Sequence, residues 1–394
     1  MRHNSLGVYV SVPFCRSKCT YCNFASGVYP AGDHERYVAR LIQDLTSARA
    51  QASQMSANLP RTVDTVYLGG GTPSLLAPEL ILRWFAALRE EFAVEAGAEI
   101  TVECAPGQLA DGTLEAMVEA GVNRVSLGVQ SFIDREAHET GRLHSRAVVL
   151  ADLRRLRAAG IENLNVDLIA GLPGQTFPSW DESLSVLIDC GIPHASVYML
   201  EVDEDSRLGR EMLNGGTRYR AGLVPSDEAI ARMYETAIER LDDAGIEQYE
   251  ISNFARAGFA SRHNMRYWQR RPYLGLGLDA SSALDGEDAY VLRTKTADEL
   301  KAYLDDREPA ETAWLSLDRQ MEEAWFLGLR LNRGVDVAAL EQEFGNERVG
   351  PGLRAAQRLA DDGLLTFDSG KVRLTAPGRM LSNEVFQEFL GLGL

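Results

Sequence analysis

Three absences narrow the class of protein before any motif is considered. No run of 18 apolar residues occurs in the 394 residues, and the N-terminus carries no apolar stretch typical of a signal peptide, so no transmembrane segment is predicted. Basic residues are scarce: 40 Lys and Arg stand against 57 Asp and Glu, and the net charge of −17 argues against nucleic-acid binding. Only five cysteines are present, and an odd number favours a reducing compartment over a disulfide framework. We therefore expect a cytoplasmic protein that binds no nucleic acid.

The few cysteines are concentrated in one place. Three of the five lie within eight residues, as Cys15-x-x-x-Cys19-x-x-Cys22, directly after the apolar run 8–14. Thiolates at this spacing can bind three irons of one cubane cluster, whereas a zinc site or a ferredoxin-type cluster is closed by four protein ligands. The alternative, three buried free cysteines, does not explain the clustering. We therefore expect a [4Fe-4S] cluster on Cys15, Cys19 and Cys22, with one iron open to an exogenous ligand.

Short apolar runs alternate with helical patterns over the first half of the chain. This alternation is typical of βα units in a parallel sheet. In parallel barrels the chemistry lies at the carboxyl ends of the strands, and the polar motifs of this sequence stand at those ends. We predict an α/β fold, a (βα)6 partial barrel, with strands at residues 8–14, 65–69, 100–104, 124–129, 163–169 and 195–200.

The second half of the chain is less regular. Apolar periodicity predicts a helix near 226–244, and charged residues around Pro309 mark a domain boundary. Beyond it, helical patterns precede a hairpin with its turn at 368–370, an order that resembles a winged-helix module. The acidity of the chain favours an accessory domain over a DNA-binding one. The predicted units are a core barrel, a barrel extension and a small C-terminal winged-helix-like α+β domain, at residues 1–225, 226–312 and 313–394.

Five further stretches resemble one group of proteins: Tyr-Leu-Gly-Gly-Gly-Thr-Pro-Ser (67–74), Ser-Leu-Gly-Val-Gln-Ser-Phe (126–132), Gly-Arg-Leu-His (141–144), Asp-Leu-Ile-Ala-Gly-Leu-Pro-Gly-Gln-Thr (167–176) and His-Asn-Met-Arg-Tyr-Trp (263–268). Together with the cysteine motif they resemble the radical S-adenosylmethionine (SAM) superfamily, in which SAM binds the open iron through its amino and carboxylate groups. The subgroup contains oxygen-independent coproporphyrinogen III oxidase and a related heme chaperone. The resemblance covers nearly the full length and implies a radical SAM barrel with SAM as a cofactor.

The resemblance assigns SAM-binding roles to residues at the strand ends. Gly70, Gly71 and Thr72 belong to the glycine segment that holds the methionyl amino group. Glu103 is placed on the bound SAM, whose positive charges would partner its carboxylate. Asp167 interrupts an apolar strand, and acids that end a strand beside a nucleotide commonly bind ribose hydroxyls.

Three more residues match SAM-contacting positions of the family, namely Gln130, Arg142 and Tyr9. From the residues alone, a structural salt bridge also explains Arg142. Strand packing equally explains Tyr9.

Residues 263–268 separate the functions within the subgroup. His is the usual axial ligand of heme iron, and Tyr267 and Trp268 offer faces on which a porphyrin could stack. The arginines at 262, 266, 270 and 271 could pair with heme propionates. A His among aromatic residues is by itself more often structural. The resemblance favours heme, with His263 as its ligand, because His-Asn-x-x-Tyr-Trp is the heme-associated motif of the chaperone branch.

Departures from the decarboxylating oxidase point the same way. Phe24 stands where the oxidase has a fourth cysteine, and Cys15 lies too near the start of this sequence for the long N-terminal extension of that enzyme. Ser261 occupies a position that is often cysteine in the chaperones, so covalent heme attachment at that position is not expected.

The resemblance thus implies a heme chaperone that binds one [4Fe-4S] cluster, SAM and heme. It would pass heme to acceptor hemoproteins and use an electron donor such as a flavodoxin or ferredoxin. Two enzymatic alternatives stay open. One is oxygen-independent coproporphyrinogen III oxidase, which decarboxylates propionates by radical chemistry, and the other is a radical SAM methyltransferase that opens heme.

Overall fold

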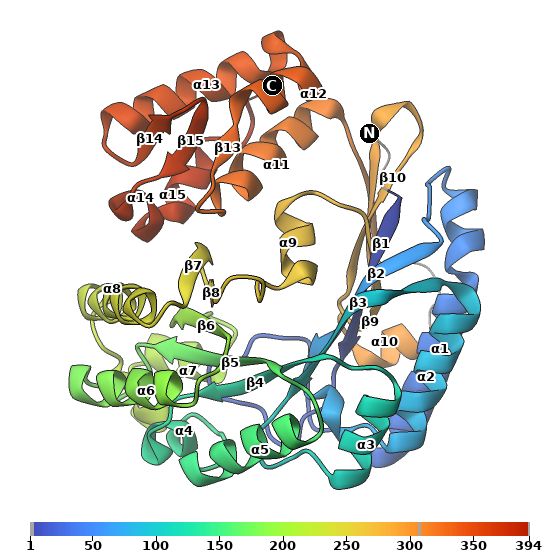
Figure 1. Cartoon of the computed structure of the whole chain (residues 1–394), viewed down its shortest axis with the longest axis vertical. Helices are drawn as coiled ribbons and strands as arrows, with labels where there is room; N and C mark the ends of the chain where they lie inside the picture. Colours follow the sequence, from blue (N-terminus) through green and yellow to red (C-terminus); the bar gives the residue numbers. More distant parts are fainter. Residues whose placement is uncertain (1–3, 306–308, 393–394) are drawn as a thin grey trace.

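One large sheet organises most of the molecule. The structure is a computed structural model that describes residues 4–305 and 309–392. The centre of the sheet is six parallel strands in chain order: β1 (Ser5–Val12), β2 (Thr62–Gly70), β3 (Ala93–Cys104), β4 (Arg124–Gln130), β5 (Asn163–Ala170) and β6 (His194–Met199) (Figure 1). These strands match the six predicted ones, so the predicted α/β partial barrel is confirmed.

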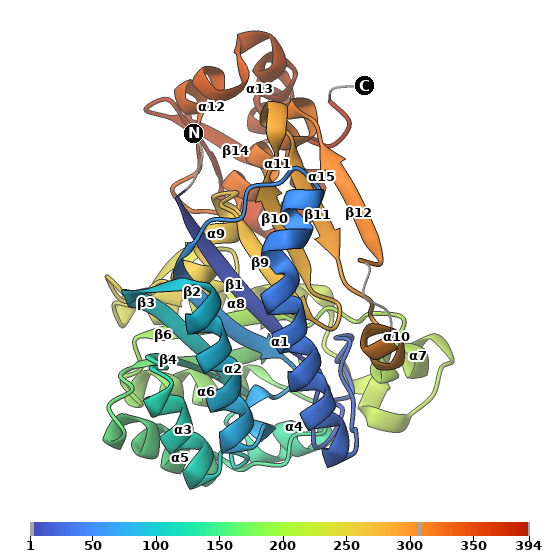
Figure 2. The ribbon, with the colours of Figure 1, turned by 90° about the vertical axis from the view of Figure 1, so that its right-hand side faces the viewer.

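The two faces of these strands differ in polarity. Alternate side chains point to opposite faces, and the outer face carries buried apolar residues such as Val66, Leu127 and Val166. Figure 2 shows α1 and α2 lying along this outer side. The inner face is polar: the register sets Glu103 beside Ser126. The helices that cover the outer face are α1 (Ala31–Gln54), α2 (Pro78–Glu91), α3 (Asp111–Glu119), α4 (Asp134–Glu139), α5 (Arg146–Ala158) and α6 (Phe177–Asp189).

Strand β3 starts earlier than predicted, at Ala93 rather than at residue 100. Its first residues pair with the beginning of β2, as in the pair of Thr62 with Ala93. They are mostly exposed and carry no apolar alternation, because only the later part of β3 enters the core.

Further short strands extend both edges of the sheet. Beyond β6 lie β8 (Asn253–Ala255) and then β7 (Glu247–Glu250), both antiparallel. On the other edge β9 (Tyr273–Gly277) runs parallel to β1. Antiparallel strands then follow, β10 (Ser281–Asp285), β11 (Val291–Lys295) and β12 (Glu311–Leu315), so that 12 strands are described in the order β12-β11-β10-β9-β1-β2-β3-β4-β5-β6-β8-β7. These additions are three to five residues long, too short to show a clear period of two.

Four helices accompany this second half of the sheet: α7 (Arg207–Leu213), α8 (Asp227–Asp243), α9 (Arg262–Trp268) and α10 (Leu300–Asp305). Helix α8 is the one predicted near 226–244, and the Ser226 hydroxyl caps it by accepting a hydrogen bond from the Ala229 amide. Helix α9 carries the His-Asn-x-x-Tyr-Trp motif and lies on the inner side of the strands (Figure 1).

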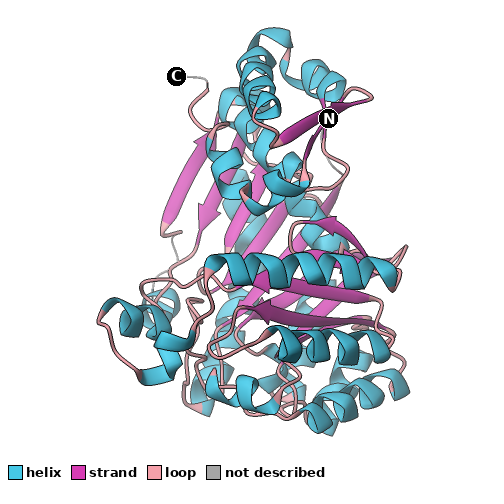
Figure 3. Ribbon diagram, turned by 90° about the vertical axis from the view of Figure 1, so that its left-hand side faces the viewer, coloured by secondary structure: helices cyan, strands magenta, loops and turns pink. Residues whose placement is uncertain are grey.

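The C-terminal part forms a small α+β domain with its own core around Trp325 and Phe389. Figure 3 shows its helices beyond the upper end of the large sheet. The predicted boundary at 312–313 falls inside β12, which pairs with β11, so the small domain begins only with α11. Its elements are α11 (Leu317–Leu329), β13 (Val335–Asp336), α12 (Val337–Phe344), α13 (Asn346–Asp361), β14 (Leu365–Asp368), β15 (Lys371–Leu374), α14 (Ala376–Met380) and α15 (Ser382–Gln387).

The predicted hairpin is present as β14 and β15, joined to β13 in a three-stranded antiparallel sheet. None of the described helices is long and apolar enough to cross a lipid bilayer.

Candidate functional site

A cavity of about 740 Å³ lies at the carboxyl ends of the central strands. Its volume falls within the range of ligand pockets, roughly 300–1,000 Å³. Tyr9 and His263 are not among the residues that line it. The predicted site residues that do line it are Cys15, Cys19, Cys22, Gly70, Gly71, Thr72, Glu103, Gln130, Arg142 and Asp167.

The three cysteines lie on a loop whose backbone is tied down at several points. The Cys15 amide donates to the Gly27 carbonyl (2.9 Å), and the Thr20 amide donates to the Thr140 carbonyl (3.1 Å). All three thiols are free and half-buried. No three Cys, His, Asp or Glu side chains of the described residues converge on a single metal position. In a cubane each thiolate binds a different iron, so three thiols on one loop could hold three irons of one cluster.

The glycine segment after β2 braces the cysteine loop. The Gly71 amide donates to the Val12 carbonyl (2.8 Å) and the Thr72 amide to the Phe14 carbonyl (2.7 Å). A Cβ at Gly71 would lie 2.8 Å from both carbonyl oxygens, so only glycine allows this approach. The Gly70 amide is also bonded, to Glu103.

Glu103 is a half-buried carboxyl with two hydrogen-bond donors. The Tyr67 hydroxyl donates to Oε1 (2.8 Å) and the Gly70 amide to Oε2 (3.1 Å). Burial nevertheless raises the pKa of Glu103 to about 7, against the opposing effect of these bonds. A ligand with a positive charge would restore the ionised form. No role was predicted for Tyr67, although it stands two residues before Gly69 and therefore on the same face of β2.

Asp167 lies on β5 within a group of polar side chains. The Ser126 hydroxyl donates to Oδ2 (3.1 Å) and the Asn165 amide to Oδ1 (2.7 Å). Burial raises the pKa of Asp167, which these hydrogen bonds oppose. The carboxyl thus faces the cavity while its neighbours fix its orientation, an arrangement that suits binding of vicinal hydroxyls.

Arg142 has an unsatisfied group at the cavity. Its Nε is buried and has no hydrogen-bond partner among the described residues, which is uncommon unless a ligand completes the site. Gly128 makes room for it, because a Cβ there would lie 2.8 Å from Arg142 Nη2. Gln130, beside it, has a left-handed backbone with φ of 69°, and such strain often accompanies function. Together with the cysteine loop, these residues fit an iron–sulfur cluster and a nucleoside-bearing ligand.

Replacing Asp167 with asparagine should weaken SAM binding about tenfold to a hundredfold, because the charged acceptor for ribose hydroxyls is lost. The cluster should be retained, since Asp167 is no iron ligand. Isothermal titration of the reconstituted protein measures this, with the exposed Asp189→Asn as the matched control. An unchanged affinity for SAM in Asp167→Asn would show that Asp167 is not part of the SAM site.

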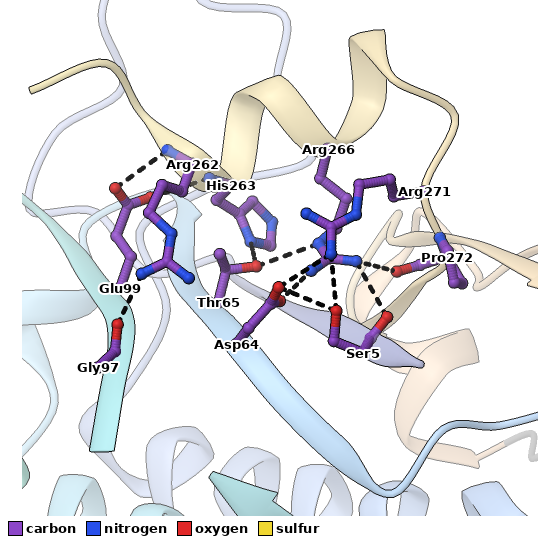
Figure 4. Close-up of polar contacts among 10 residues, drawn as sticks. All are labelled: Ser5, Asp64, Thr65, Gly97, Glu99, Arg262, His263, Arg266, Arg271 and Pro272. Atoms are coloured by element: carbon purple, nitrogen blue, oxygen red, sulfur yellow. Dashed lines mark hydrogen bonds and ion pairs between the residues drawn. The ribbon is translucent and has the colours of Figure 1, made fainter. Parts of the chain in front are cut away.

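Two residues of the His-Asn-x-x-Tyr-Trp motif, His263 and Arg266, are buried and face β1, β2 and β3 (Figure 4). The His263 ring has no exposed surface, and its nitrogens hydrogen-bond to the Thr65 hydroxyl (3.0 Å) and the Tyr267 hydroxyl (2.9 Å). Its amide donates to Glu99 (2.9 Å). The centroids of the Tyr9 and His263 rings are 6.4 Å apart, a contact in keeping with the strand-packing explanation of Tyr9. Ligation of heme by His263 stays a prediction, and it would require one of the two ring hydrogen bonds to break so that one nitrogen becomes free for the iron.

The arginines predicted to pair with propionates are already engaged within the protein. Arg266 is fully buried in an ion pair with Asp64, and Arg271 binds the same carboxylate (3.1 Å) (Figure 4). Arg270 pairs with Glu343 (2.7 Å), and Arg262 donates to the Gly97 carbonyl (2.6 Å). The contacts of Arg266 and Arg271 with Asp64 anchor α9 to the sheet, whereas Arg270 reaches α12 of the C-terminal domain.

Ser261, which replaces a frequent cysteine, also has a structural role. Its hydroxyl accepts a hydrogen bond from the Asn264 amide (3.2 Å) and caps α9, and the side chain is buried. A serine is among the preferred residues at this helix position.

The His263 ring should stay neutral between about pH 8 and about pH 5. An ordinary histidine, whose pKa is about 6.5, would become protonated within this range. Burial and the charge of Arg266 lower the pKa of His263 to about 3. The unfolded chain then binds more protons below about pH 6.5, so the contribution of His263 to stability is complete above that pH and is lost as the pH falls towards 3. Long-range ¹H–¹⁵N spectra report the protonation state of the ring. The His263→Gln variant identifies the His263 signals, because they are missing from its spectrum. A ring that titrates near 6.5 would contradict this burial.

Known proteins are similar to this chain in both sequence and fold. Residues 9–187 match the Radical SAM superfamily, and residues 315–381 match the HemN C-terminal domain. The heme chaperone HemW of Bacillus subtilis (strain 168) is 33% identical over 97% of this chain and 98% of its own length. HemW of Lactococcus lactis subsp. lactis (strain IL1403) is 34% identical over 97% of this chain and 96% of its own length.

Among solved structures, coproporphyrinogen III oxidase (HemN) from Escherichia coli, a radical SAM enzyme, aligns with a TM-score of 0.83. The alignment covers 98% of this chain and 90% of that one at 24% identity, a likeness of fold alone. The HemW relatives match at higher identity over nearly the full length of both chains. The chain therefore belongs to the family of the heme chaperone HemW, within the radical SAM superfamily.

Proposed function

We propose that this chain is a heme chaperone, which holds one [4Fe-4S] cluster, SAM and heme and passes heme to acceptor hemoproteins. The observation that carries the proposal is the similarity to HemW heme chaperones over 97% of the chain. The cavity supports it, because three thiols line its wall and Phe24, where the oxidase has a fourth cysteine, lines it with an exposed ring.

The residues of the cavity divide the task of holding the cofactors. Cys15, Cys19 and Cys22 would bind three irons, and the open iron would bind SAM. Glu103 would balance the positive charge of SAM, and Asp167 would accept hydrogen bonds from its ribose. When bound, the cluster supplies one-electron redox chemistry, for which an electron donor such as a flavodoxin or ferredoxin is proposed.

Purified, anaerobically reconstituted protein should bind heme in equimolar amount and deliver it to an apo-hemoprotein. It should not oxidise coproporphyrinogen III when SAM and a reductant are supplied. Soret absorbance follows binding and transfer, and porphyrin fluorescence after oxidation follows turnover. Sustained formation of protoporphyrinogen with stoichiometric SAM cleavage would instead support the oxidase.

A further inference from the structure

The cavity continues beyond the predicted SAM site to the C-terminal domain. Its second part, which we call the distal part, is lined by residues from α8, the turn between β7 and β8, α14, α15 and the end of α11. None of them was predicted from the sequence. They include Tyr234, Ile251, Ser252, Arg330, Met380 and Ser382.

Arg330 is the cation of the distal part, and two neighbours hold it. Its Nη2 lies 3.4 Å from Glu250 Oε2, and its guanidinium carbon lies 4.2 Å from the centre of the Trp268 ring. Glu250 is fully buried and already accepts hydrogen bonds from the Ser252 amide (3.0 Å) and the Asn253 side chain. Both of these bonds are made to Oε1, and the contact of Oε2 with Arg330 uses only one of the five guanidinium donors.

One of these donors is buried without a partner. Arg330 Nε has no hydrogen-bond partner among the described residues, although it is shielded from solvent. Because Arg330 also lines the cavity, a ligand bound there can supply the missing acceptor. A carboxylate fits best, because the planar fork of arginine binds its two oxygens together.

The neighbours of Arg330 define the rest of the ligand. Ile251 and Met380 present apolar surface to the cavity, and Tyr234 adds an aromatic ring. A ligand that satisfies both features has an apolar body with a carboxylate at its edge. Building on the heme-chaperone function proposed above, we infer that Arg330 binds a propionate of heme whose ring lies in the distal part of the cavity.

This assignment also gives the His-Asn-x-x-Tyr-Trp motif a part in heme binding. The four arginines at 262–271 are paired within the protein, and the His263 ring is closed off. Trp268, the last residue of the motif, stacks on Arg330 and so fixes the guanidinium that faces the cavity. The motif would thus act through Trp268 as a positioning residue.

The test compares two ligands on matched variants of the full chain. Ferric heme and its dimethyl ester, which lacks the carboxylates, are titrated by Soret absorbance against wild type, Arg330→Met, Arg330→Lys and the exposed control Arg333→Met. We expect Arg330→Met to weaken heme binding about tenfold to a hundredfold, as loss of a charged hydrogen bond does. Its affinity for the ester should equal that of wild type. The heme affinity of Arg330→Lys should lie between those of wild type and Arg330→Met, because lysine keeps the positive charge but cannot bind both carboxylate oxygens at once.

Different failures identify different errors. Unchanged heme affinity in Arg330→Met, an equal loss for heme and ester, or an equal loss in Arg333→Met would each overturn the Arg330 site and leave the chaperone function standing. Wild-type protein that binds no heme at all would overturn the chaperone function and the site with it. Iron content and urea unfolding confirm that each variant is folded and carries its cluster.

Discussion

Replacement of Cys15, Cys19 or Cys22 by alanine is expected to abolish the [4Fe-4S] cluster in each case. The three thiols line one wall of the same cavity, and each would bind a different iron, so no neighbour can substitute for the lost thiolate. The loop itself should survive, because its backbone hydrogen bonds to Gly27 and Thr140 do not involve the thiols. Iron and sulfide analysis after anaerobic reconstitution measures the effect.

Cys190→Ala is the matched control for this experiment. Cys190 ends α6 and does not line the cavity, so this variant should keep the full iron and sulfide content. Full iron retention in Cys19→Ala would refute the three-cysteine site. Loss of iron from Cys190→Ala would show that cluster content depends on something other than the cavity thiols.

Arg266→Met is expected to lower the free energy of unfolding by about 3 kcal/mol, near the lower end of the range for breaking a buried ion pair. The guanidinium is fully buried, pairs with Asp64, and donates to the carbonyls of Pro272 (2.9 Å) and Ser5 (3.2 Å). Methionine removes the guanidinium donor of both carbonyls, and the Pro272 carbonyl keeps its hydrogen bond from the Gly7 amide (3.2 Å). Arg271 still pairs with Asp64, which keeps the loss from being larger.

Urea unfolding at neutral pH measures this effect, and Arg262→Met on the same helix is its control. Arg262 is exposed, so the same substitution there should change stability by only about 0.5 kcal/mol. Equal stabilities of the two variants would contradict the anchoring role of Arg266. The comparison also guides the interpretation of heme-binding data on α9 variants. Loss of the Arg266–Asp64 pair would lower heme binding by displacing α9, even where no residue in contact with heme is changed.

Much of the site followed from local sequence features. The six central strands are apolar runs whose outer face is buried. The apolar residues on that face can therefore be recognised in the sequence without knowledge of what covers them. Parallel strands bring their carboxyl ends to one rim, so the residues after β1, β2, β3, β4 and on β5 had to meet once those strands existed. The cysteine loop and the glycine segment are adjacent for the same reason, because β1 pairs with β2.

Other features depended on contacts between distant segments, which no local pattern encodes. Arg266 and Asp64 lie far apart in the sequence, and their pairing decides that the motif helix α9 is held against the sheet with the His263 ring enclosed. Arg330 meets Trp268 only because the C-terminal domain folds back over the barrel. The sequence by itself therefore determined the barrel, the cysteine loop and the residues at its rim, through local periodicity and strand order. Only the tertiary structure decided which buried charges are already paired and which remain free to bind a ligand.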